Sequence, residues 1–177
     1  MRAEFRASFE HQGKSLRGYA AVYGVETRPE MQLREMIDAG AFDTVLASAD
    51  LDVPLLVGHR DDALLARTSS GTLRLSTDKR GLVIDADLPD TTLGRDTAEL
   101  VSRGDLRHMS FGFIAGPVEW RAKVRHVRSI DALLDVSLVT NPAYLATEAQ
   151  LRRLETVDFD GYAELRKRQL TRIMEEA

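Results

Sequence analysis

The sequence contains no cysteine among its 177 residues. The chain therefore has no disulfide framework, no thiolate ligand for a metal ion and no cysteine nucleophile. If the protein is a covalent catalyst, its nucleophile must be an oxygen or a lysine.

Long apolar segments are also missing. The N-terminus, MRAEFRASFEHQGKS, lacks the apolar core of a signal peptide, and no later window approaches the roughly 20 apolar residues that span a bilayer. Apolar residues make up 44% and charged residues 29% of the chain, which is typical of a soluble globular protein. We therefore expect a protein that remains in the cytoplasm where it is made and does not contact a membrane.

The sequence carries no signal for a nucleotide or a nucleic acid. It has neither a Walker loop nor a dinucleotide fingerprint, and we expect no cofactor. The formal charge is -4, so there is no overall attraction to nucleic acid. The basic run at 119–128, EWRAKVRHVR, alternates charged and apolar residues as a solvated strand does, and Trp120 is its only stacking aromatic. We expect no nucleic-acid partner.

Short strands dominate the predicted secondary structure. Residues 3–9 and 15–23 alternate apolar and polar side chains around a His-Gln-Gly-Lys turn, which predicts an opening hairpin. The turn signals Ser-Ser-Gly and Asp-Lys-Arg-Gly divide residues 63–89 into a three-stranded meander. The other predicted strands lie at 31–37, 51–58, 107–120, 123–130 and 133–139.

Two isolated helices and a helical C-terminus complete the prediction. A short helix is expected within 38–48, with Asp38 as its cap, and a longer one at 90–104, with Asp90 as its cap and Gly104 as its stop. From about residue 144 the sequence becomes charged and amphipathic.

This pattern predicts an α+β fold: a mainly antiparallel β-barrel, or a strongly bent sheet, surrounded by a few helices. We expect one domain over residues 1–150 and a helical segment over 151–177.

Ser110 is the candidate nucleophile, in the segment RHMSFGFIAG. A serine hydroxyl needs a base within hydrogen-bond reach, and histidine is the usual one. His59 directly follows the apolar run VPLLVG, which would bring it to the rim of the core. In an extended chain Phe111 and Phe113 lie on the face opposite Ser110 and would anchor the strand, while Gly112 permits close approach.

A histidine base needs an orienting partner. Asp135 interrupts the apolar run ALLDVSLV, where a buried charge would require a partner. The alternative is an Asp135 that faces solvent, with Leu134 and Val136 turned inward. His11 and His126 are expected at the solvated surface. Residue types and spacing alone do not decide between these possibilities.

Five segments taken together resemble the tailed-phage prohead maturation proteases, a family similar in fold and catalytic plan to the herpesvirus assemblins. The resemblance covers residues 2 to about 150, in the order LRGYAAVYG (16–24), EMIDAGAFDTVL (35–46), LLVGHRDD (55–62), LVSRGDLRHMSFGF (100–113) and LLDVSLVTNPAY (133–144).

The resemblance implies a serine endopeptidase with Ser110 as nucleophile and His59 as general base. Asp135 is the preferred orienting residue, with His126 and His108 as weaker candidates. The oxyanion hole is unassigned, although backbone N–H groups near 139–141 are candidates.

The implied substrate is the capsid protein precursor or scaffold, and the chain itself, inside the assembling procapsid in the host bacterial cytoplasm. A homodimer or higher homo-oligomer, formed through the helices after residue 144, is expected. Two rival functions are a non-catalytic β-barrel that binds scaffold or capsid, and a small-molecule hydrolase that uses the same three residues.

Overall fold

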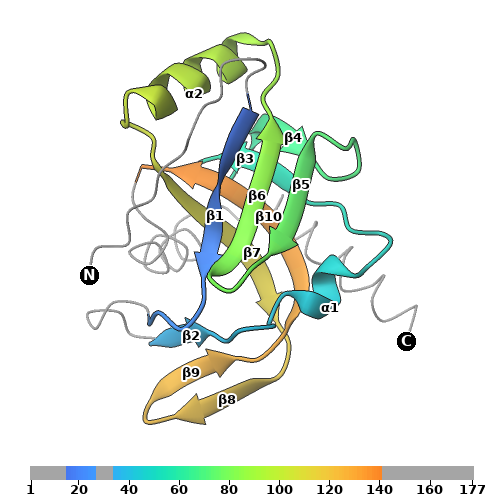
Figure 1. Ribbon diagram of the computed structural model, residues 1–177, viewed down its shortest axis with the longest axis vertical. Helices are drawn as coiled ribbons and strands as arrows, with labels where there is room; N and C mark the ends of the chain where they lie inside the picture. The colour runs from blue at the N-terminus through green and yellow to red at the C-terminus, as the bar shows by residue number, and fades with distance from the viewer. Residues whose placement is uncertain (1–14, 27–33, 141–177) are drawn as a thin grey trace.

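The structure is a computed structural model that describes residues 15–26 and 34–140 (Figure 1). These residues form ten strands and two helices, so the fold is α+β with strands predominating. The predicted strand at 3–9, the C-terminal helices and the boundary near residue 150 lie outside the described residues. The proposed oligomer contact after residue 144 lies there as well.

The first sheet has the strand order β1-β6-β5, and both of its pairs are antiparallel. Its strands are β1 (Ser15–Val22), β5 (Leu73–Thr77) and β6 (Gly81–Asp87). The Asp-Lys-Arg-Gly turn joins β5 to β6 as predicted, because Asp78 Oδ1 accepts the N–H groups of Arg80 and Gly81 at 2.7 and 3.1 Å. β1, predicted as the second strand of the opening hairpin, pairs with the distant β6, and its predicted partner strand at 3–9 lies outside the described residues.

The second sheet has the order β4-β3-β10-β7. Its strands are β3 (Pro54–Val57), β4 (Arg60–Arg67), β7 (His108–Ala115) and β10 (Ile130–Val139). The pairs β3–β4 and β10–β7 are antiparallel, whereas β10 and β3 are parallel. This sheet carries the candidate site residues.

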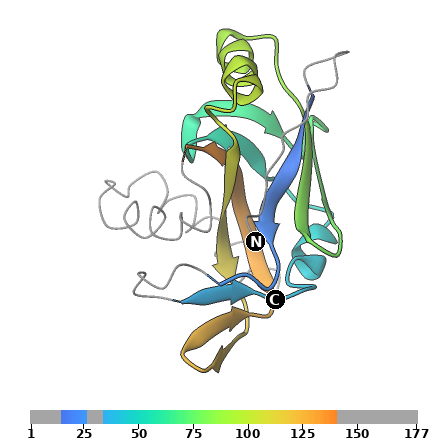
Figure 2. The same ribbon diagram turned by 60° about the vertical axis from the view of Figure 1, so that its left-hand side comes forward.

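A third, smaller sheet has the order β2-β9-β8. It consists of β2 (Glu35–Ile37), β8 (Val118–Arg121) and β9 (Val124–Val127), with β2 and β9 parallel. Its β8–β9 hairpin projects from one end of the molecule, opposite the longer helix (Figures 1 and 2). The basic run at 119–128 is therefore a hairpin, and the predicted strand 107–120 divides at Gly116 and Pro117.

Within the described residues the three sheets remain open and do not close into the expected antiparallel barrel. The central strand β10 explains the difference. Eight of its ten residues are buried, so both of its faces are covered, and it pairs on one edge with β7 and on the other with β3. A strand buried on both faces selects its neighbours by packing, and here one neighbour is a parallel strand from far earlier in the chain.

The predicted meander within 63–89 is wrong, because β4 pairs with β3 while β5 pairs with β6 in the other sheet. Between β4 and β5 the chain crosses from one sheet to the other. Thr68 fixes this crossing: its Oγ1 accepts the Val53 N–H at 2.8 Å and donates to the Leu51 carbonyl at 2.9 Å. The turn residues predicted correctly where the strands end, but they did not predict which strands pair with each other.

Helix α1 (Asp43–Leu46) is shorter than the predicted helix at 38–48, and its N-cap is Phe42. Asp38 does not cap it, because the Asp38 carboxylate contacts His126 and its N–H donates to the Val127 carbonyl.

Helix α2 (Thr92–Ser102) confirms the helix predicted at 90–104, but its cap is Thr91, whose Oγ1 accepts the Gly94 N–H at 3.1 Å. Asp90 instead pairs with Arg95. Gly104, with φ +80°, ends the helix as expected. Neither described helix is long and apolar enough to cross a membrane.

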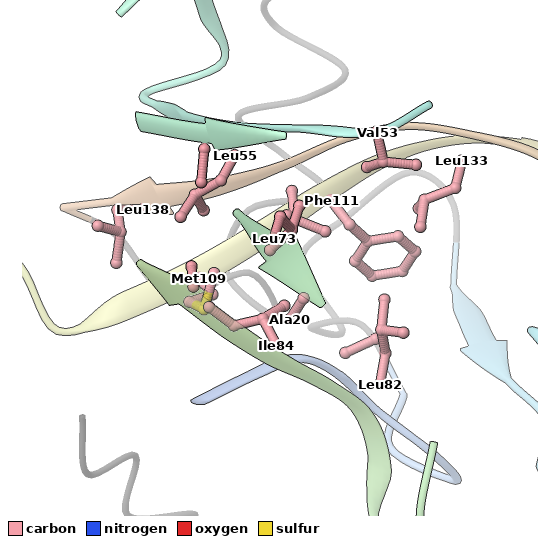
Figure 3. Close-up of a cluster of buried hydrophobic side chains, with 14 of the residues drawn as sticks. Ala20, Val53, Leu55, Leu73, Leu82, Ile84, Met109, Phe111, Leu133 and Leu138 are labelled. Atoms are coloured by element: carbon pink, nitrogen blue, oxygen red, sulfur yellow. The ribbon is translucent and has the colours of Figure 1, made fainter. Parts of the chain in front are cut away.

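The main core lies between the first and second sheets (Figure 3). Leu82 and Ile84 of β6 face Met109 and Phe111 of β7 across this space. The Phe111 ring lies 5.0 Å from Phe113 and 5.6 Å from Phe42, centroid to centroid. The predicted anchoring of β7 by its two phenylalanines is confirmed.

We expect Phe42→Ala to lower the free energy of unfolding by about 3–5 kcal/mol, because it removes a fully buried ring and leaves a cavity beside Phe111. Urea unfolding of the full chain would measure this loss. Leu64→Ala is the matched control, since Leu64 is an exposed large apolar residue. A loss for Phe42→Ala no larger than that of the control would contradict this account of the core.

Candidate active site

The register of β7 on β10 brings Ser110 directly opposite Ser137. Residues opposite each other on neighbouring strands project to the same face of a sheet, and residues two apart on one strand share a face. Phe111 points into the main core (Figure 3). Ser110, Ser137 and Asp135 therefore share the other face of the second sheet, away from the first sheet.

His59 occupies the two-residue turn between β3 and β4, between the paired residues Val57 and Arg60. Gly58 and His59 have φ values of 66° and 57°, as a type I′ hairpin turn requires. Glycine adopts this conformation without steric cost, whereas a residue with a Cβ pays about 1–2 kcal/mol.

Hydrogen bonds to β10 hold this strained turn. The Gly58 N–H donates to the Leu138 carbonyl at 2.8 Å, and the His59 N–H donates to Ser137 Oγ at 3.2 Å. The turn is thereby fixed against the strand that carries Asp135, two residues before Ser137.

The His59 imidazole contacts the Asp135 carboxylate, with Nδ1 and Oδ1 2.6 Å apart. Only 12% of the His59 side chain and 2% of the Asp135 side chain are exposed. Because the carboxylate accepts, Nδ1 carries the proton, and in the neutral imidazole the lone pair is then on Nε2. The alternative of a solvent-facing Asp135 is wrong, since this carboxylate is buried and paired.

Ser110 lies on the strand next to Asp135, and its side chain is on the same face. The residue is buried, with 3% of its surface exposed. Neighbouring strands are about 4.8 Å apart, so the Ser110 backbone is about 10 Å from β3, whose end carries His59. The structure thus joins His59 directly to Asp135 and puts Ser110 beside this pair, across one strand.

The two weaker orienting candidates have other surroundings. His126 is on β9 in the third sheet, where its Nδ1 lies 2.8 Å from Asp38 Oδ1. Only 14% of its side chain is exposed, so the expectation of a solvated His126 is wrong. His108 is on β7 opposite Val139, and Arg107 Nε donates to its Nε2 at 3.4 Å. His11 lies outside the described residues.

Ser137 is the site residue that the sequence analysis missed. Its Oγ donates to Asp135 Oδ1 at 2.7 Å while accepting the His59 N–H, and the residue is fully buried. The signal was present in the spacing, because residues two apart on a strand share a face, so a strand that buries Asp135 on one face turns Ser137 to that same face.

The expected oxyanion groups near 139–141 fall at the edge of the described region. Val139 pairs with His108, and Asn141 lies outside the described residues. No cluster of three or more metal-ligating side chains occurs within residues 15–26 and 34–140.

A sequence model of the caudovirus prohead serine protease family matches residues 2–160 of the chain. This range includes every described residue and all three candidate catalytic residues. A comparison with curated proteins found no match.

Burial, and to a smaller degree the Arg107 guanidinium, lower the pKa of His108. The unfolded chain binds this proton near the ordinary pKa of about 6.5, and the folded chain only at lower pH. The His108 contribution to the free energy of unfolding should therefore decrease as the pH falls from about 7 through 6.5 toward the lowered pKa.

In His108→Gln, the loss of stability between pH 7 and pH 5, measured by urea unfolding, should be smaller than in the wild type. Equal losses in the two proteins would contradict the lowered pKa.

Proposed function

The chain belongs to the caudovirus prohead serine protease family, and on that premise we propose that it cleaves the capsid protein precursor or scaffold through an acyl-enzyme on Ser110. Proteases of this kind act on capsid proteins inside the assembling procapsid. The proposed triad is Ser110 as nucleophile, His59 as general base and Asp135 as the residue that orients the base. The chain itself is a further proposed substrate.

The observation that carries this proposal is the 2.6 Å contact between His59 Nδ1 and Asp135 Oδ1 beside the strand of Ser110. A buried carboxylate on Nδ1 fixes the imidazole tautomer and stabilises the imidazolium that forms when Nε2 takes a proton.

In the proposed reaction Ser110 Oγ attacks the peptide carbonyl carbon, and its proton passes to His59 Nε2. The C–N bond of the tetrahedral intermediate then breaks, and the leaving amine takes the proton from His59. Water attacks the resulting ester, again losing a proton to His59, and the released Ser110 hydroxyl recovers that proton. Asp135 remains ionised throughout.

One observation favours a second candidate function. Ser110 is 3% exposed, as a non-catalytic capsid-binding module would allow. A protease requires this hydroxyl to become accessible when a peptide binds. Labelling by a fluorophosphonate, which modifies activated serines, separates the two functions.

We expect the wild type, incubated with the capsid precursor of the same phage, to release defined fragments detectable by intact-mass spectrometry. Ser110→Ala should lower the rate by at least about 10³-fold, because it removes the nucleophile. Ser102→Ala is the matched control: this serine is exposed on α2, and its hydroxyl donates to the Glu99 carbonyl of the same helix.

Fluorophosphonate labelling of the wild type and of Ser102→Ala, but not of Ser110→Ala, is expected in parallel. Full cleavage by Ser110→Ala would overturn the proposed nucleophile. If the wild type neither cleaves the precursor nor reacts with the reagent, the binding module is favoured. Labelling together with hydrolysis of small esters alone would identify the small-molecule hydrolase.

Asp135→Asn tests the orienting residue. An amide at this position can present its NH₂ to Nδ1 and so favour the wrong imidazole tautomer, and we expect kcat to fall about 10⁴-fold. Asp131→Asn, an exposed position on the same strand, is the control. Single-turnover cleavage measures the effect, and a loss of less than tenfold would argue against Asp135.

A further inference from the structure

We propose that Ser137 is a positioning residue of this site, which holds the His59 imidazole by linking its main chain to the Asp135 carboxylate. The inference rests on the proposed function, because it assigns a role relative to the proposed base. It adds a fourth side chain to the three that the sequence motifs indicate.

Three hydrogen bonds form a closed ring. The His59 N–H donates to Ser137 Oγ at 3.2 Å, Ser137 Oγ donates to Asp135 Oδ1 at 2.7 Å, and His59 Nδ1–H donates to the same oxygen at 2.6 Å. The ring therefore begins at the main chain of His59 and returns to its side chain. The Ser137 hydroxyl holds the main chain of His59 and the Asp135 carboxylate holds its ring, so the two torsions χ1 and χ2 between them are restrained from both sides.

The direction of each bond follows from the chemistry of the groups. A backbone N–H can only donate, so Ser137 Oγ accepts the His59 N–H with one of its lone pairs. An ionised carboxylate can only accept, so the Ser137 hydroxyl donates its single proton to Asp135. Because the Ser137 hydroxyl donates its proton to Asp135, it does not donate to the base His59. The proposed nucleophile is therefore its cross-strand neighbour Ser110. The donated bond also stabilises the ionised carboxylate.

The strain in the turn makes this link necessary. His59 has a φ of 57°, in a region that disfavours residues with a Cβ. Without the Ser137 hydroxyl, the hydrogen bond from Gly58 N–H to the Leu138 carbonyl still holds the turn, but the hydrogen bond from the His59 N–H to Ser137 Oγ is lost. The turn can then relax, and the imidazole moves relative to Ser110.

Ser137→Ala removes both bonds, and we expect kcat to fall about 10²-fold, the cost of an angstrom-scale misplacement of a reacting group. KM should change little, because both hydrogen bonds of the Ser137 hydroxyl are made to groups of the site, the His59 N–H and the Asp135 carboxylate. Ser137→Thr retains the hydroxyl and should restore most of kcat. Ser76→Ala, an exposed strand serine on β5, is the matched control and should leave kcat unchanged.

A second readout does not depend on activity. The proton in a short bond between imidazole Nδ1 and a buried carboxylate gives a resolved downfield resonance in the ¹H NMR spectrum. We expect this His59 resonance in the wild type, in Ser76→Ala and in Ser110→Ala. It should shift upfield or broaden by solvent exchange in Ser137→Ala, and return in Ser137→Thr.

The outcomes separate the two proposals. Retained cleavage by Ser110→Ala would reject the proposed function, whatever Ser137 does. An inactive Ser110→Ala together with a Ser137→Ala protein of wild-type kcat and unchanged resonance would reject the positioning role alone. If Ser137→Ala does not fold, the nearly isosteric Ser137→Cys decides: a reduced kcat and a shifted resonance support the role, and wild-type values overturn it.

Discussion

A carboxylate buried within a β-sheet must be compensated, and the pairing of Asp135 with His59 meets this requirement. Asp135 is on β10, the strand on which the second sheet is built. To supply the imidazole, the turn after β3 must lie against β10, and the parallel pairing of β3 with β10 brings it there. The same strand holds β7 on its other edge, so one buried strand sets the relative positions of all three candidate residues.

Much of the local structure could be predicted from the sequence. The strand positions, the turn before β6 and the helix that ends at Gly104 follow from alternation and turn residues. The strand partners could not be predicted, because a period of two identifies the buried face of a strand but not its neighbour. For this reason the predicted meander was wrong, and the expected closed barrel is not found among the described residues. The helix expected at 38–48 was too long, because the Asp38 carboxylate contacts the distant His126 instead of capping a helix.

The candidate site was predictable where a residue conflicts with its surroundings. A charged Asp135 inside an apolar run is such a conflict, and so is a histidine directly after a buried strand. Ser137 was missed because a serine among apolar residues is ordinary, and its role depends on a hydroxyl that accepts from one distant group and donates to another. The burial of Ser110 depends on packing around the sheet, which no local pattern contains.

The His59–Asp135 contact joins residues 76 positions apart in the chain. Such a contact must overcome the entropy of closing a long loop, and it cannot exist before β10 has been synthesised and inserted between β3 and β7. A nascent chain that already contains His59 and Ser110 therefore lacks the paired imidazole until its last described strand is in place. Completion of the fold, rather than translation of the individual residues, is what assembles the site.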